Sequence, residues 1–209
     1  MSDGEPAEGR AGVNRIEAFS DGVLAIIITI MVLELKAPES PGAGELLKLW
    51  PTFLAYVLSY AYIAIYWVNH HRLFGHAKVV TDSLVWSNIA LLFALSLVPF
   101  TTAYLDHHFM WPLASLLYAA SLLLPAVAYT WLLRTIAATG RQDTAARAYY
   151  RAIGRKGLAC NLTYAGAAAL AWWVPLAGVI IPAIIAVLWM KPWSRIDSWL
   201  LGCPGPDGE

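Results

Sequence analysis

Six apolar segments constrain the fold of this chain more than any other feature of its sequence. They cover roughly residues 15–35, 50–70, 84–105, 111–133, 157–173 and 174–190. A hydrocarbon core about 30 Å thick is crossed by about 20 helical residues, and the second, third and fourth segments reach that length. The last two segments are shorter and meet at Trp172 and Trp173, which predicts a tight hairpin with tryptophans at the membrane interface. The pattern predicts an all-α polytopic membrane protein with six transmembrane helices per chain.

The composition agrees with placement in a bilayer. The 209 residues are 59% hydrophobic and only 13% charged, whereas a soluble domain carries about 25% charged residues. We therefore expect three regions along the chain. They are a disordered cytoplasmic tail at 1–14, a six-helix transmembrane domain at 15–190 and a cytoplasmic C-terminal tail at 191–209.

The lysines and arginines indicate how the chain is oriented. Twelve of the 14 fall on one side of the membrane, and only Lys36 and Lys48 fall on the other. Because short cytoplasmic loops are enriched in basic residues, we expect both termini to lie in the cytoplasm. Six of the twelve lie in the connection 134–156, which we interpret as a topology anchor that extends the fourth and fifth helices past the lipid. Contact with anionic lipid is the alternative interpretation.

The first segment, RIEAFSDGVLAIIITIMVLEL at 15–35, places polar side chains next to an apolar run. At 100° per residue, one face of this helix collects a stripe, and Ser20 and Asp21 lie more than about 90° away from it. The stripe consists of Arg15, Gly22, Ile26, Thr29 and Leu33, with Ile30 at its edge. Packing against neighbouring helices, with Asp21 capping the helix start, explains the pattern in one way. A functional site explains it in another, because an acid within the membrane needs a partner or water, and Arg15 is one candidate partner.

The second and third segments carry polar groups at the same depth as Asp21. In YWVNHHRLF, the side chains of Trp67, His70 and His71 share a helix face, from which they can donate hydrogen bonds to Asp21. A metal site is disfavoured, because adjacent histidines diverge by about 100° and no carboxylate or cysteine completes a ligand set. Asn88, in the third segment, is expected to bond across helices.

The other motifs considered are absent, so they argue against several functions and assign none. Pro99 predicts a kink in the third helix. The sequence contains no Ser–His–Asp arrangement, Gly-rich phosphate loop, HExxH motif, TVGYG filter or Arg-rich voltage sensor. We expect no enzymatic activity, no cofactor, no resident metal and no nucleic-acid partner. Cys160 and Cys203 lie toward the cytoplasm, where thiols stay reduced, so no disulfide is expected.

The residues of the first half resemble a known family. Arg15, Phe19, Ser20 and Asp21 match the first-helix signature Arg-x-x-x-Phe-Ser-Asp of the transmembrane protein 175 family, the endosomal and lysosomal potassium channels. The stretches YWVNHHRLF and NIALLFALSLVPFTTAYL are similar to that family's second and third helices. The likeness covers about the first hundred residues, and the last three segments match only in number and hydropathy.

The resemblance implies a potassium-selective channel made by a homotetramer in a prokaryotic cell membrane. The pore would be lined by the first helix of each subunit, and potassium ions would pass through it transiently. Carried over by distance from the signature Asp, apolar rings fall on Ile26, Ile30 and Leu33, with a hydroxyl ring at Thr29. These are the residues of the stripe.

The resemblance also implies a structural role for the Phe-Ser-Asp group, which in the family bonds to the second and third helices. Here we expect Asp21 to reach those helices through His70 or His71 and Asn88. Two other functions stay open. One is a proton-coupled or proton-permeable transporter that uses Asp21 and the two histidines, and the other is a non-conducting scaffold in the membrane.

Overall fold

The fold of the protein, taken from a computed structural model, consists of helices joined by short loops in residues 5–140 and 144–190, which are the residues that the structure describes. Eight helices lie in these ranges: α1 (Glu5–Leu33), α2 (Ala43–Lys48), α3 (Trp50–Phe74), α4 (Asp82–Ser96), α5 (Val98–His107), α6 (Pro112–Thr139), α7 (Thr144–Ala171) and α8 (Ala177–Trp189). The all-α fold is therefore confirmed. The expected tail at 191–209 and Cys203 lie outside the described residues.

The six predicted segments all fall in helices, and the third is divided between α4 and α5. The division lies at Leu97, two residues before Pro99, and Pro99 stands in the first turn of α5. Proline has no backbone N–H and its ring displaces the preceding turn, so the predicted kink is found here as a break. Among the described residues, four spans are long and apolar enough to cross a membrane: 9–33, 50–74, 82–107 and 112–139. The helix α8 is apolar but shorter.

The N-terminal region differs from the expectation of a disordered tail. The helix α1 begins at Glu5, so residues 5–14 prolong it, and Asp21 lies in mid-helix rather than at the helix start. Two glycines explain why this extension can pack. An ideal Cβ at Gly9 would lie 3.0 Å from the Lys78 carbonyl oxygen, and one at Gly12 would lie 2.9 Å from Val80. Only glycine lets the loop between α3 and α4 approach the helix so closely.

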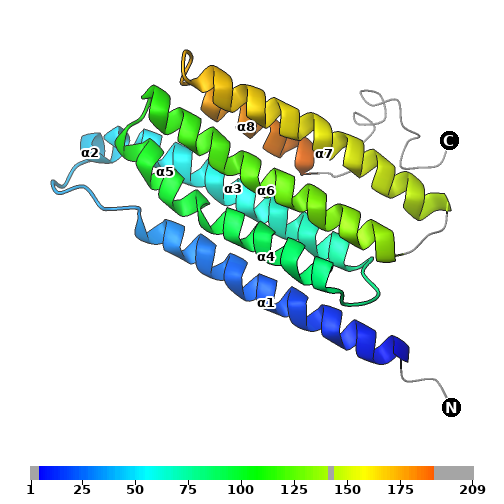
Figure 1. The fold of residues 1–209 in the computed structure, drawn as a ribbon. Helices are drawn as coiled ribbons and strands as arrows, with labels where there is room; N and C mark the ends of the chain where they lie inside the picture. Colours follow the sequence, from blue (N-terminus) through cyan, green and yellow to red (C-terminus); the bar gives the residue numbers. More distant parts are fainter. Residues whose placement is uncertain (1–4, 141–143, 191–209) are drawn as a thin grey trace.

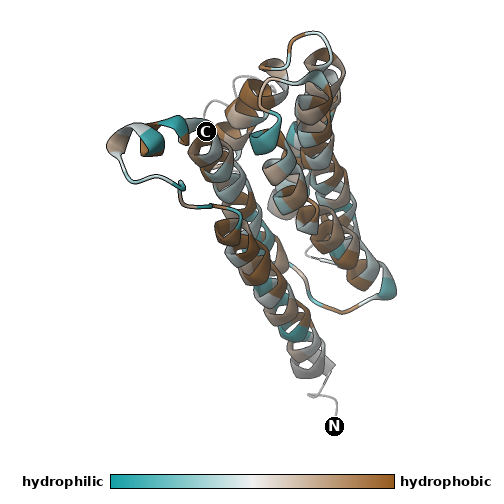
Figure 2. Cartoon of the chain, turned by 90° about the vertical axis from the view of Figure 1, so that its left-hand side faces the viewer, coloured by the Kyte–Doolittle hydropathy of each residue, from teal (hydrophilic) through white to brown (hydrophobic). Residues whose placement is uncertain are grey.

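The helices form a bundle with α1 at one edge. Figure 1 shows α1 along one side, α7 and α8 along the opposite side, and α3 to α6 between them. The α6–α7 connection is short, because both helices extend toward it as expected from the 134–156 region. Figure 2 shows apolar residues along most of the helices, whereas hydrophilic residues gather at α2 and in the loops.

Several polar side chains inside the bundle are paired with one another. Ser59 of α3 lies between two partners: its Oγ accepts a hydrogen bond from Thr102 of α5 at 2.8 Å and lies 3.0 Å from the Tyr118 hydroxyl of α6. The hydroxyls of Thr101 and Ser121 lie 2.7 Å apart. Because lipid offers no hydrogen bonds, such pairs let polar groups be buried between transmembrane helices.

Candidate functional site

The helix α1 has one exposed face and one buried face. The buried face, which packs against the bundle, consists of Val13, Ser20, Leu24, Ile27 and Met31. On the other face, Ile26 is 59% exposed, Ile30 is 44% exposed and Leu33 is 77% exposed. These exposed side chains are three of the stripe residues predicted from the helical wheel. A single chain therefore leaves the stripe without a covering element.

The other members of the stripe share this exposure. The side chains of Arg15 and Thr29 are exposed, and a Cβ built at Gly22 would meet no atom within 4 Å. Phe19 of the signature is also exposed. The Thr29 hydroxyl donates a hydrogen bond to the Ile26 carbonyl at 2.9 Å. The hydroxyl oxygen keeps its lone pairs, so it can still accept a hydrogen bond or coordinate a cation.

A chain of hydrogen bonds joins the buried face of α1 to α3 and α4. The Asn88 amide nitrogen donates to Ser20 Oγ at 2.9 Å, and the Ser20 hydroxyl donates to the Ile16 carbonyl at 2.8 Å. Asn88 Oδ1 lies 2.8 Å from His70 Nε2, so the proton of that bond belongs to the histidine. The side chains of Ser20, His70 and Asn88 are each at most 1% exposed. These three residues fix how α1 is rotated against the bundle.

Two further contacts join α1 to α3 nearer the surface. Trp67 Nε1 donates to Asp21 Oδ1 at 2.8 Å, and His71 Nδ1 lies 2.7 Å from Glu17 Oε1. Glu17 and Asp21 are four residues apart on one helix, as are Trp67 and His71 on the other. Because residues four apart lie one turn above each other on the same face, an antiparallel helix pair brings these two pairs together.

Of the partners predicted for Asp21, Trp67 is therefore confirmed, whereas Arg15, His70 and His71 are not its partners. Asp21 bonds to Trp67 rather than to Arg15, His70 or His71, while Ser20 carries the link to His70 through Asn88. The sequence interpretation also missed Glu17. The signal for it was present, since Glu17 lies one turn before Asp21 just as His71 lies one turn after Trp67.

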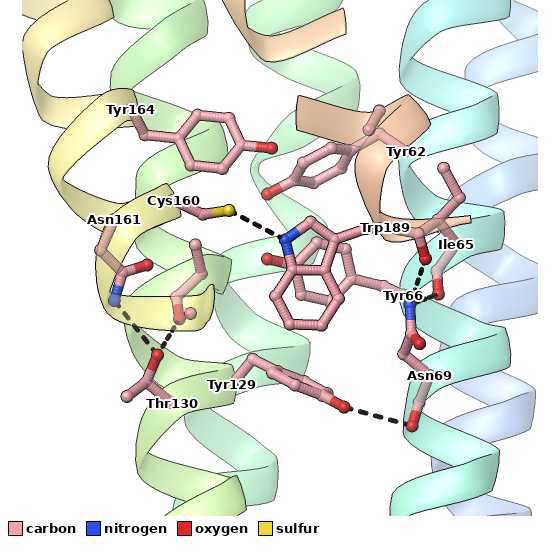
Figure 3. A pocket seen from close by; sticks show the side chains of 13 residues that line it. Tyr62, Ile65, Tyr66, Asn69, Tyr129, Thr130, Cys160, Asn161, Tyr164 and Trp189 are labelled. Carbon is pink, nitrogen blue, oxygen red and sulfur yellow. Dashed lines mark hydrogen bonds between the residues drawn. The ribbon is translucent and has the colours of Figure 1, made fainter. Parts of the chain in front are cut away.

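A small cavity lies on the far side of the bundle from α1. It is enclosed by α3, α6, α7 and α8, and Figure 3 shows aromatic side chains pointing into it from several of these helices. The residues labelled there are Tyr62, Ile65, Tyr66, Asn69, Tyr129, Thr130, Cys160, Asn161, Tyr164 and Trp189. The cavity measures about 30 Å³, room for only one or two water molecules, so it offers no passage to a hydrated ion.

No group of three His, Cys, Asp or Glu residues comes together to hold a metal ion within the described parts of the chain. The polar groups near α1 instead use one another as partners. Their arrangement can orient a helix, and the exposed stripe can line a surface formed with other copies.

A family model and two bacterial relatives of this chain all carry the name of a potassium channel. The family model described as "Endosomal/lysosomal potassium channel TMEM175" matches residues 15–99. A protein named as a potassium channel from Chryseobacterium sp. (strain P1-3) is 38% identical over 188 residues, which span 89% of this chain and 96% of the relative. Another from Chamaesiphon minutus is 39% identical over 145 residues, covering 65% of this chain and 70% of the relative.

A more distant relative and a solved structure carry the same family name. A rat protein named as the endosomal/lysosomal proton channel TMEM175 is 33% identical over 90 residues, 37% of this chain and 18% of its own length. The crystal structure of a lysosomal potassium-selective channel TMEM175 homolog from Chamaesiphon minutus superposes with a TM-score of 0.77 at 32% identity. That match covers 86% of this chain and 96% of the other. This chain belongs to the TMEM175 family.

Proposed function

We propose that this chain is a potassium-selective channel that conducts passively through an apolar constriction formed by α1 of four identical subunits. The single observation that carries the proposal is the exposed apolar stripe on α1, opposite a face that is bonded into the bundle. The bacterial relatives named as potassium channels support the choice of ion. The relatives are channels rather than enzymes, and we propose no catalytic role.

The constriction acts through its apolar rings. Four copies of Ile26, Ile30 and Leu33 around an axis would form a narrow neck that loses its water and blocks ions, so a small rotation or widening would open it. Potassium gives up hydration water more readily than sodium, which favours potassium in such a neck. The Thr29 hydroxyls, one turn from Ile26 and Leu33, would replace part of the lost hydration.

The bonds on the buried face of α1 would hold this neck in register. The links from Ser20 to Asn88 and from Asp21 to Trp67 fix the rotation of α1, and a rotation of one residue would turn the stripe by about 100° away from the axis. In this proposal the signature residues are positioning residues. They do not touch the ion.

The placement in the membrane is also a proposal. We infer that α7 and α8 complete six transmembrane crossings as a hairpin, with both termini in the cytoplasm of the cell membrane. The turn at 172–175 supports this, because Trp172 and Trp173 are 52% and 75% exposed at its tip. Tryptophan favours the interface between lipid and water.

Proton permeability is the second candidate function. The vertebrate relatives named as proton channels favour it, as do the acid–histidine contact of Glu17 with His71 and the placement of Asp21 nearby. The geometry gives a relay little support, because Asp21 bonds to Trp67 and His70 bonds to Asn88. Flux that saturates and follows a pH gradient would favour this candidate.

The test is ion flux through the purified chain in liposomes, with potassium and sodium compared. Ile30→Ala should widen the neck and raise flux or weaken selectivity severalfold. Ile184→Ala is the matched control, because Ile184 is a similarly exposed isoleucine on α8 at the opposite edge of the bundle. Equal flux from wild type and Ile30→Ala would remove Ile30 from the neck. Native mass spectrometry of the same sample should show four copies.

A further inference from the structure

The side chain of Asn69, on α3, lines the small cavity between α3, α6, α7 and α8 (Figure 3). Its Nδ2 atom donates hydrogen bonds to two carbonyl oxygens, that of Ile65 at 2.9 Å and that of Trp189 at 3.2 Å. Because carbonyl oxygens only accept hydrogen bonds, the nitrogen of the amide must face them. These two contacts therefore fix the orientation of the amide, and the Oδ1 atom lies on its other branch.

The Oδ1 atom of Asn69 is a buried acceptor without a donor. Asn69 is 4% exposed, and no N–H or O–H group of the described residues lies within hydrogen-bond distance of this oxygen. Donors nearby are used elsewhere: the Tyr129 hydroxyl donates to the Asn69 carbonyl at 3.3 Å, and Trp189 Nε1 donates to Cys160 Sγ at 3.2 Å. A buried oxygen without a hydrogen bond destabilises the fold, so a donor from outside the chain is favoured here.

The cavity beside Asn69 restricts what this donor can be. Its volume of about 30 Å³ is enough for a water molecule, which needs about 10–15 Å³, whereas a cavity that binds benzene measures about 150 Å³. A cation is disfavoured, because the Lys156 ammonium already lies 5.0 Å from the centre of the Trp189 ring that borders the cavity. None of the described residues that line the cavity is an Asp or Glu that could balance a positive charge. The donor is therefore small and neutral.

We propose that this cavity binds a water molecule that donates a hydrogen bond to Asn69 Oδ1. A buried water is typically held by about two to four polar groups. The lining supplies further acceptors, because the hydroxyls of Tyr129 and Thr130 donate to backbone carbonyls and their oxygens keep lone pairs. Cavities lined only by apolar side chains stay dry, and this mixed lining instead favours water.

The bound water completes a set of contacts at the C-terminal end of α8. Asn69 Nδ2 and Lys156 Nζ donate to the last two carbonyls of that helix, those of Trp189 and Leu188, which have no partner within the helix itself. Asn69 lies about 160° from Trp67 around α3, so it faces away from the contacts with α1. The water site therefore joins the end of α8 to the helix that carries those contacts. The inference does not depend on conduction or on the number of subunits.

The test is a crystal structure of the full-length protein, grown with rubidium in place of potassium, at a resolution that shows ordered water. We expect a density peak about 2.7–3.0 Å from Asn69 Oδ1, the usual distance for a hydrogen bond between two oxygens. The peak should show no anomalous scattering, because rubidium occupies only cation sites. Asn88 is the matched control in the same map, since it is similarly buried but its Oδ1 already accepts a hydrogen bond from His70, so no water peak is expected there.

A variant that removes the acceptor completes the test. Asn69→Leu keeps a side chain of similar size without the oxygen, and the peak should be lost from its structure. Gly166→Ala, whose added methyl group meets no atom within 4 Å, should retain the peak. Three results would overturn the proposal: no peak beside Asn69 Oδ1 in the wild type, a peak there with anomalous scattering, or a peak that persists unchanged in Asn69→Leu. If Asn69→Leu does not fold, the wild-type structure still decides.

Discussion

The helix α1 and the α6–α8 region lie in one chain but are held by different forces. The α1 span is the most apolar of the four, yet only 22% of its most apolar stretch is buried, against 61% for α6. Polar contacts made by Arg10, Glu17, Ser20 and Asp21 attach α1 to the rest of the chain. The helices α6 and α8 instead approach through small residues such as Gly178 against Ser115. In a membrane, an apolar composition shows that a helix can lie in lipid, because lipid tails are as apolar as the side chains. Only the buried fraction shows how closely the helix packs against its neighbours. A helix that we propose to meet other copies of the chain can thus be apolar and still be little buried within its own chain.

The largest effect is expected where packing is closest. A Cβ at Gly178 would lie 2.7 Å from the Ser115 carbonyl oxygen and 2.9 Å from the Ala171 Cβ. Gly178→Ala should therefore separate α6 from α8 and cost about 1–3 kcal/mol of stability, measured as a lower Tm in detergent. Gly166→Ala is the control, because nothing lies within 4 Å of its new methyl group. Equal Tm values for the two variants would show that the α6–α8 contact is looser than described.

The second largest loss of stability is expected when the hydrogen bonds that attach α1 to the bundle are removed. Asn88→Ala removes the partner of both Ser20 and His70, which are buried, and should cost about 1–2 kcal/mol. It should also free the rotation of α1 and so change ion flux. Ser96→Ala, which removes an exposed hydroxyl from the same helix α4, should leave Tm and flux unchanged. A normal Tm with Asn88→Ala would mean that apolar packing alone holds α1.

A smaller effect is expected at the surface end of the same attachment. Trp67→Phe keeps an aromatic ring but removes the Nε1 donor to Asp21, which should cost about 0.6 kcal/mol. The expected result is a slightly lower Tm, with flux less affected than in Asn88→Ala. Trp86→Phe is a suitable control, since Trp86 is 63% exposed. A larger decrease in Tm than with Asn88→Ala would identify the Asp21–Trp67 hydrogen bond as the main link between α1 and the bundle.

An effect of the opposite sign is expected on the exposed stripe. Gly22→Ala adds a methyl group to open space and a better helix former to α1, so the folded chain should gain up to about 1 kcal/mol. The Tm of the protomer should stay the same or rise slightly. If instead the variant loses its tetramer by native mass spectrometry, neighbouring copies of α1 approach closely at Gly22, which would sharpen the contrast with Gly178.

Much of the fold could be read from the sequence because bilayer thickness and hydrogen bonding restrict the choices. The apolar segments, the break at Pro99 and the extension of the helices around 134–156 follow from length, proline chemistry and charge. The wheel also predicted which face of α1 carries Ile26 and Leu33 and which carries Ser20. The N-terminal extension of α1 was missed, since it depends on the loop that packs against Gly9 and Gly12.

The sequence by itself determined the helices, their apolar character and the two faces of α1, because these depend on residue type and on the 3.6-residue period. The tertiary structure alone decided the partners: Trp67 for Asp21, Asn88 for Ser20 and His70, and Glu17 for His71. A periodic pattern fixes the direction in which a side chain points, but not the register between two helices. A shift of one turn between α1 and α3 would give Asp21 a different partner, and only the packing of the whole bundle selects among such registers.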